Sequence, residues 1–141
     1  MNESGGRHPR AILDTSALIL LDRIPSFEVL PRVPLITALT LAELSVGPLV
    51  AKSEVERARR VAHLQRVEAT FSPLPFDVEA ARAFGGVVAS LRQAGRRVAA
   101  RRRDAMIAAI ALAKELPVYT CDARDFNSID GLEVVTIPVP S

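Results

Sequence analysis

The residues of this chain best suited to chemistry are acids that lie at the ends of apolar segments. Asp14 and Asp122 end predicted strands, Asp104 opens a predicted helix, and Glu43 lies one turn into another. In an open parallel sheet, ligands gather where strands end and the following helices begin. The placement therefore predicts that these four carboxylates converge on one site.

Each acid taken alone also has a purely structural explanation. Asp14 and Asp104 could be helix N-caps, Asp122 a turn residue, and Glu43 a surface charge near a helix start. Asp14 and Glu43, however, lie within apolar sequence, where an unpaired charge is costly. Clustered carboxylates also repel and raise one another's pKa unless a cation lies among them. Together the acids favour a site for a divalent cation.

The available ligands indicate which cation such a site would take. Oxygen ligands without nitrogen or sulfur are typical of Mg²⁺ or Mn²⁺. A zinc site would have Cys121 as its sole thiolate, and the two histidines, His8 and His63, show no ligand spacing. A bound divalent cation lowers the pKa of a water and stabilises charge on a phosphate, so no protein nucleophile is required.

The four acids are expected to differ in how they bind the cation. Mg²⁺ keeps several of its waters and uses one or two carboxylates. Asp14 and Asp104 are therefore the expected primary ligands, with Glu43 and Asp122 binding directly or through water. Three nearby hydroxyls could orient those waters, or serve only as caps and turn residues. They belong to Thr15, Ser16 and Thr120.

Apolar runs alternate with amphipathic helical stretches along the chain. Helical periodicity covers residues 16–23, 40–46, 53–69, 77–91 and 104–116. Short apolar runs predict strands at 11–14, 35–38, 118–121 and 132–137. Strands separated by helices favour a parallel sheet, because parallel neighbours need right-handed crossovers that place helices on its faces. The predicted fold class is α/β, a three-layer sandwich with a central parallel sheet flanked by helices.

Length and composition suit one domain. The 141 residues are 49% hydrophobic, enough for an aliphatic core. We expect a flexible N-terminal tail over residues 1–10 and a single domain over 11–141. The apolar run 11–21 is interrupted by Asp14 and is shorter than the roughly 20 residues of a membrane span. A lone cysteine, Cys121, forms no internal disulfide, which suits a reducing cytoplasm.

Arginines crowd the segment that precedes Asp104. The formal net charge is only +2, yet the sequence pI is about 9.2. A local basic patch attracts polyanions, although a solvated helix end and loop would have the same composition. The residues expected to contact a polyanion are Arg96, Arg97, Arg101, Arg102 and Arg103.

Four short motifs match, in order, those of a known family. They are Leu-Asp-Thr-Ser-Ala-Leu at 13–18, Thr-Leu-Ala-Glu-Leu at 40–44 with Gly47, Arg-Asp-Ala-Met-Ile-Ala-Ala at 103–109, and Thr-Cys-Asp-Ala-Arg-Asp-Phe at 120–126. From about residue 11 to residue 139, the chain resembles the VapC-type toxins of the PIN-domain family. The family varies in the fourth motif, so either Asp122 or Asp125 could lie closer to the metal. Asp125 could instead fix the turn that buries Phe126.

The resemblance implies a Mg²⁺- or Mn²⁺-dependent endoribonuclease, the toxin of a type II toxin-antitoxin module. It implies cleavage of a structured cellular RNA, tRNA or rRNA, and arrest of translation. The arginine patch would then bind RNA phosphates, with an affinity that falls as salt rises. The implied partners are a cognate VapB-type antitoxin laid across the groove and a second copy in a homodimer. Apolar faces of the helices from Thr40 and Ser53 could supply these contacts or belong to the core.

Two rival functions start from the same residues. In a phosphatase, Asp14 would be the nucleophile, but the usual haloacid-dehalogenase pattern has a second aspartate where this chain has Ser16. A catalytically silent RNA-binding module could also keep the fold. The intact acids of all four motifs argue against that alternative.

Overall fold

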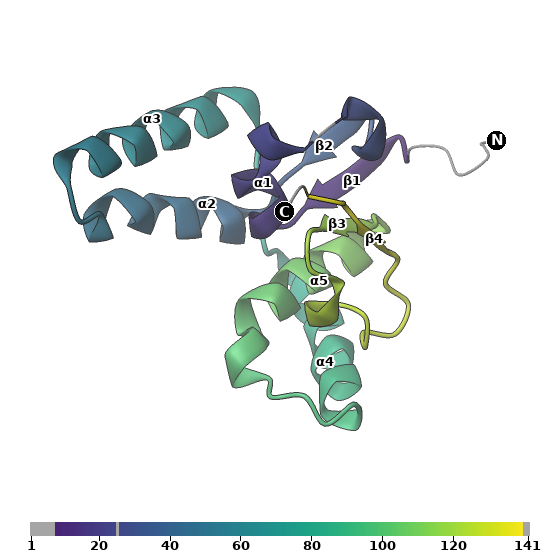
Figure 1. Cartoon of the computed structure of the whole chain (residues 1–141). Helices are drawn as coiled ribbons and strands as arrows, with labels where there is room; N and C mark the ends of the chain where they lie inside the picture. The colour runs from purple at the N-terminus through teal and green to yellow at the C-terminus, as the bar shows by residue number, and fades with distance from the viewer. Residues whose placement is uncertain (1–7, 25, 140–141) are drawn as a thin grey trace.

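The computed structural model describes residues 8–24 and 26–139 (Figure 1). Most of the predicted tail, residues 1–7, lies outside the described residues. His8 pairs its Nε2 with Glu133 Oε2 at 2.7 Å, and Arg10 already belongs to the first strand. Among the described residues, no helix has the combined length and hydrophobicity needed to cross a bilayer.

Four parallel strands form the central sheet in the order β2-β1-β3-β4. Their bounds are Arg10–Leu13 for β1, Val33–Leu35 for β2, Val118–Thr120 for β3 and Val134–Thr136 for β4. The second strand lies earlier than the predicted 35–38, because Thr37 caps the next helix and accepts a hydrogen bond from the Thr40 amide at 3.5 Å. Pro34 is tolerated there because β2 is an edge strand.

Helices cover both faces of the sheet (Figure 1). The α-helices are α1 Thr15–Ile19, α2 Ala38–Val46, α3 Glu54–Thr70, α4 Val78–Gln93 and α5 Arg102–Lys114. The predicted helix 16–23 is two pieces, α1 and the 3₁₀ turn η1 (Leu21–Arg23). The Ser53 hydroxyl accepts from the Glu56 amide at 3.0 Å, as the capping-box spacing predicts.

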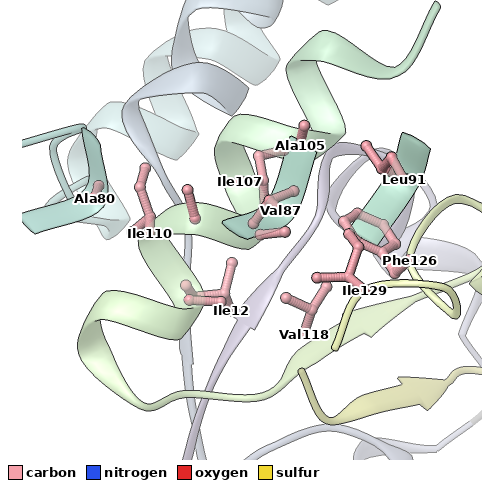
Figure 2. Close-up of a cluster of buried hydrophobic side chains, with 13 residues drawn as sticks. Ile12, Ala80, Val87, Leu91, Ala105, Ile107, Ile110, Val118, Phe126 and Ile129 are labelled. Carbon is pink, nitrogen blue, oxygen red and sulfur yellow. The ribbon is translucent and has the colours of Figure 1, made fainter. Parts of the chain in front are cut away.

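Side chains alternate between the two faces of each central strand, which divides the core in two. Ile12 and Val118 pack with α4 and α5, whereas Leu13 and Tyr119 face α1 and α3. Figure 2 shows the first of these clusters, where the fully buried Phe126 also inserts. The three-layer α/β prediction is confirmed.

The direction of the helices brings the candidate site to one edge of the sheet. Asp14 directly follows β1, and the 3₁₀ turn η5 (Ala123–Asp125) follows β3. Because α5 leads back into the parallel strand β3, its N-terminus lies at the carboxyl edge. Asp104, in the first turn of α5, is therefore delivered to the same edge as Asp14.

Candidate metal and phosphate site

Asp14 is fixed in place by the start of α1. Its Oδ1 accepts the Ala17 amide at 2.9 Å and the Ser16 hydroxyl at 2.8 Å. Its Oδ2 accepts the Thr120 hydroxyl at 2.6 Å, which ties β1 to β3. The carboxylate is thus a helix N-cap, as its structural explanation required, and also a fixed acid at the centre of the sheet edge.

Burial sets the acidity of Asp14. The residue is only 4% exposed, and loss of solvation raises the pKa of its carboxyl above the ordinary 3.8. The hydrogen bonds from Thr120, Ala17 and Ser16 oppose this increase, and the charge of Asp125 adds to it. A buried carboxylate beside another acid is a group that a cation would stabilise.

Glu43 reaches the edge from α2 and has partners on both oxygens. Its Oε1 accepts the Thr15 hydroxyl at 2.5 Å, and its Oε2 lies 2.7 Å from Arg103 Nε. Thr15 Oγ1 is also 2.9 Å from Thr40 Oγ1. Because Thr15 gives its single hydrogen to Glu43, Thr40 must donate to Thr15. The relay Thr40, Thr15, Glu43 orients the glutamate.

Asp104 is the most perturbed acid of the site. Burial first, then the charges of Asp125, Asp14 and Glu43, raise its pKa from 3.8 to about 6. The positive charge of Arg103 only partly offsets these effects. The charges of three other carboxylates therefore act on Asp104, at the place where the strand ends meet.

The fourth motif contributes Asp125 to this group and turns Asp122 away from it. Both Asp122 oxygens bind Arg124, with Oδ1 2.9 Å from Nε and Oδ2 2.7 Å from Nη2. These bonds lower the pKa of Asp122 to about 2. Asp125 instead raises the pKa of both Asp14 and Asp104. The buried Phe126 anchors the loop that presents it.

The arginines of the basic patch have different surroundings. Arg103 pairs with Glu43, and Arg101 Nε lies 3.8 Å from Asp125 Oδ1. Arg96 donates to the carbonyl oxygen of Arg124. Arg102 and Arg103 line a hollow of about 320 Å³ that also includes Asp104. Arg97 is exposed beyond the end of α4.

A larger hollow, of about 660 Å³, is lined by Glu43 and Thr15. Ile19 and Leu44 contribute apolar surface to it, and Arg66 lines it from α3. One basic hollow therefore borders Asp104, and a second hollow of mixed character borders Glu43.

The atoms that these residues offer are of the type that binds a divalent cation, but the side chains are not placed to surround one. Their donors are carboxylate oxygens supported by hydroxyls, which is the ligand type of Mg²⁺ and Mn²⁺. Burial and neighbouring acids raise the pKa of Asp14 and of Asp104, and a cation would stabilise the charged form of both. As positioned over residues 8–24 and 26–139, however, no three acidic, histidine or cysteine side chains could jointly hold a metal ion.

Sequence reasoning missed two contacts of this site. The buried Thr40 belongs to a predicted motif, but its helical position alone does not show that it faces Thr15. The Arg103–Glu43 pair was also missed, because neither the basic patch nor the third motif shows which acid Arg103 faces. The signal in the sequence for the Thr40–Thr15 contact was a threonine and a glutamate three residues apart in an otherwise apolar helix.

Comparisons with known proteins extend over most of this chain. The PIN domain family matches residues 11–132. Among curated relatives, Ribonuclease VapC5 of Mycobacterium tuberculosis is 40% identical over 128 residues, covering 89% of this chain and 92% of the relative. Ribonuclease VapC of Rickettsia bellii is 31% identical over 104 residues, covering 74% of this chain and 76% of the relative.

Solved structures with the same fold come from toxin-antitoxin systems. VapBC-5 of Mycobacterium tuberculosis matches with a TM-score of 0.80 and 37% identity, covering 92% of this chain and 99% of the solved chain. A DNA-bound VapBC from Salmonella typhimurium matches with a TM-score of 0.73 and 26% identity, covering 89% and 96% respectively. The similarity thus extends over nearly the whole chain, including all four acidic motifs.

Proposed function

Because this chain belongs to the PIN domain family, and within it to the VapC type, we propose that it is a metal-dependent endoribonuclease acting as a toxin. The observation that carries the proposal is the placement of Asp14, Glu43 and Asp104 at the carboxyl edge of the sheet. There Thr120 binds Asp14, and Thr15 and Arg103 bind Glu43. The relatives named ribonucleases support the reaction class. A structured RNA, tRNA or rRNA, is the proposed substrate.

Mg²⁺ or Mn²⁺ is the proposed cofactor, held by Asp14 and Asp104 with Glu43 and Asp125 directly or through water. Such a cation would lower the pKa of a water and neutralise charge on the phosphate and leaving oxygen. Ser16 and Thr120 keep the Asp14 carboxylate in one orientation, and the Thr15 hydroxyl does the same for Glu43.

RNA phosphates are proposed to bind at the basic side of the site. Arg102 and Arg103 border a hollow that also contains Asp104, so a strand seated there passes next to the acids. Arg guanidinium groups match phosphate oxygens in geometry and charge. Arg96, Arg97 and Arg101 extend the basic surface on the same connection between α4 and α5.

An antitoxin of the VapB type is the proposed partner, because VapBC systems are the structural neighbours. The mixed hollow between α1, α2 and α3 offers both apolar and charged surface beside Glu43. A protein segment laid there would block the approach to Glu43 and Thr15. Homodimer formation stays a prediction from the family resemblance.

Removal of the cation is the direct test of this function. Purified protein freed from antitoxin is expected to cut total cellular RNA into discrete fragments with Mg²⁺ or Mn²⁺, and to leave it intact in EDTA. Gel analysis and end mapping of the fragments would identify the RNA. Absence of cleavage with either metal, from protein shown to be folded, would favour the silent RNA-binding module.

The two aspartates of the fourth motif are expected to respond differently to amidation. Asp125→Asn is expected to lower cleavage by about 10–100-fold, since it removes a charge coupled to Asp14 and Asp104. Asp122→Asn is expected to change cleavage by no more than about threefold, because that carboxylate is exposed and bound by Arg124.

The same RNA assay at saturating Mn²⁺ measures both variants. An equal loss in the two would show that the loop rearranges to bring Asp122 to the metal. A larger loss in Asp122→Asn would assign the fourth ligand position to Asp122.

A further inference from the structure

Arg103 and a divalent cation would compete for the same carboxylate, that of Glu43. Arg103 Nε lies 2.7 Å from Glu43 Oε2, and the other glutamate oxygen already accepts the Thr15 hydroxyl. A carboxylate oxygen can accept a hydrogen bond from a hydroxyl and still bind a cation through its second lone pair. A guanidinium at the same carboxylate instead brings a like charge next to the incoming cation.

Arg103 is free to leave this position at low cost. Its side chain is 61% exposed, compared with 23% for Glu43, so solvent can replace the contact. An ion pair with such an exposed partner contributes little to stability. Arg103 also lines the hollow of about 320 Å³ together with Arg102, so its side chain already borders the surface proposed for RNA phosphates.

We propose that Arg103 is an exchangeable counter-ion, which pairs with Glu43 in the cation-free site and transfers to an RNA phosphate when a divalent cation takes Glu43. The inference rests on the proposed ribonuclease function and adds a coupling to it. Each ligand replaces one half of the Arg103–Glu43 pair, so cation and RNA bind cooperatively.

Arg101 and Arg102 do not have the same role. The Arg101 side chain is 26% exposed and lies with its Nε 3.8 Å from Asp125 Oδ1, so it neighbours a different acid. Arg102 is exposed and, within the described ranges, forms no ion pair. Arg102 is therefore the matched control: it has the same charge, is adjacent in the chain and lacks the contact with Glu43.

The first measurement is Mn²⁺ binding to the full chain without RNA, by titration calorimetry. Arg103→Gln is expected to bind Mn²⁺ about three- to fivefold more tightly than the unmodified protein, because the competing pair is gone. Arg102→Gln removes the same charge and is expected to change the affinity by less than about twofold. Far-ultraviolet circular dichroism checks that both variants fold.

A double-mutant cycle locates the competition at the glutamate. In a Glu43→Gln background, the effect of Arg103→Gln on Mn²⁺ binding is expected to disappear. The exchange would be overturned if Arg103→Gln and Arg102→Gln changed the Mn²⁺ affinity equally, or if Arg103→Gln bound Mn²⁺ more weakly. It would also be overturned if Arg103→Gln kept its full effect on Mn²⁺ affinity in the Glu43→Gln background. A lack of Mn²⁺ binding by every form of the protein would overturn it as well.

The second measurement is binding of a 2′-O-methyl RNA oligonucleotide, used as a phosphate-bearing probe. Mn²⁺ is expected to raise its affinity at least about fivefold more in the unmodified protein than in Arg103→Gln. Equal enhancement in the two would overturn the transfer to phosphate. If Mn²⁺ competes with Arg103 for Glu43 but no RNA is cleaved, the proposed ribonuclease function is rejected and the counter-ion exchange is kept. The failures of the two proposals are therefore distinguishable.

Discussion

Asp14→Asn is expected to abolish metal-dependent RNA cleavage while the protein stays folded. Loss of a residue that hydrogen-bonds to a metal ligand typically lowers activity about 10–100-fold. Loss of the ligand itself should cost more, so we expect cleavage to fall by more than about 100-fold. The amide removes the charge at the centre of the sheet edge. The same RNA assay in saturating Mn²⁺ measures the effect.

The folded structure should tolerate this amide. The remaining oxygen can still accept the Ala17 amide and the Ser16 hydroxyl, so α1 keeps its cap. The new NH₂ group would face Thr120, whose hydroxyl can turn toward the Asp122 carbonyl oxygen 3.2 Å away. Asp14→Ala lacks these bonds and is the less informative variant. Cleavage retained by folded Asp14→Asn would remove Asp14 from the catalytic site.

Asp104→Asn is expected to have two opposite effects, lost cleavage and increased stability of the metal-free protein at neutral pH. The folded protein raises the pKa of Asp104 from 3.8 to about 6, so it holds this proton more tightly than the unfolded chain. The contribution of the protonated group is fully present below pH 3.8 and is lost as the pH rises through about 6. An amide carries no charge at any of these pH values.

The expected gain from Asp104→Asn in EDTA is about 1–2 kcal/mol at pH 8, after discounting for the solvent that partly reaches Asp104. At pH 4 the gain should be close to zero. Urea unfolding in EDTA at the two pH values measures this difference. An equal effect at both would show that the charge of Asp104 is already neutralised in the folded protein.

Divalent cation should reverse this order of stability. Cation binding stabilises the folded state of the unmodified protein but should do so much less in Asp104→Asn, which lacks one of the proposed ligands. Affinity for the cation is also expected to fall below about pH 6, where Asp104 becomes protonated. A variant that binds Mn²⁺ normally but does not cut RNA would assign Asp104 a role other than metal binding.

Local signals explain why much of the fold could be predicted. Helix periodicity, the Ser53–Glu56 cap and the apolar runs depend on residues within a few positions of one another. They predicted the α/β class and the four strands. The errors lie at boundaries, as at 35–38, where the side chain of Thr37 ends the extended segment by capping α2. The stretch 16–23 likewise changes from α to 3₁₀ geometry at Leu20.

The candidate site follows the same division between local and distant information. Strand ends and helix starts located Asp14, Asp104 and Glu43, because parallel topology sends these positions to one edge. Sequence spacing could not separate Asp122 from Asp125, which are both in the turn after β3. The separation depends on which side chain Arg124 binds and on how Phe126 enters the core.

The sequence by itself therefore determined the fold class, the acids at the sheet edge and the ligand chemistry that they offer. Only the tertiary structure decided that Asp125 lies close enough to act on Asp104. It also decided that Thr40 hydrogen-bonds to Thr15 and that Arg103 forms an ion pair with Glu43. The physical reason is the distance along the chain over which each kind of contact forms. Caps and periodic faces are set by bonds within one or two turns, whereas ion pairs between distant segments exist only after the sheet and helices have packed.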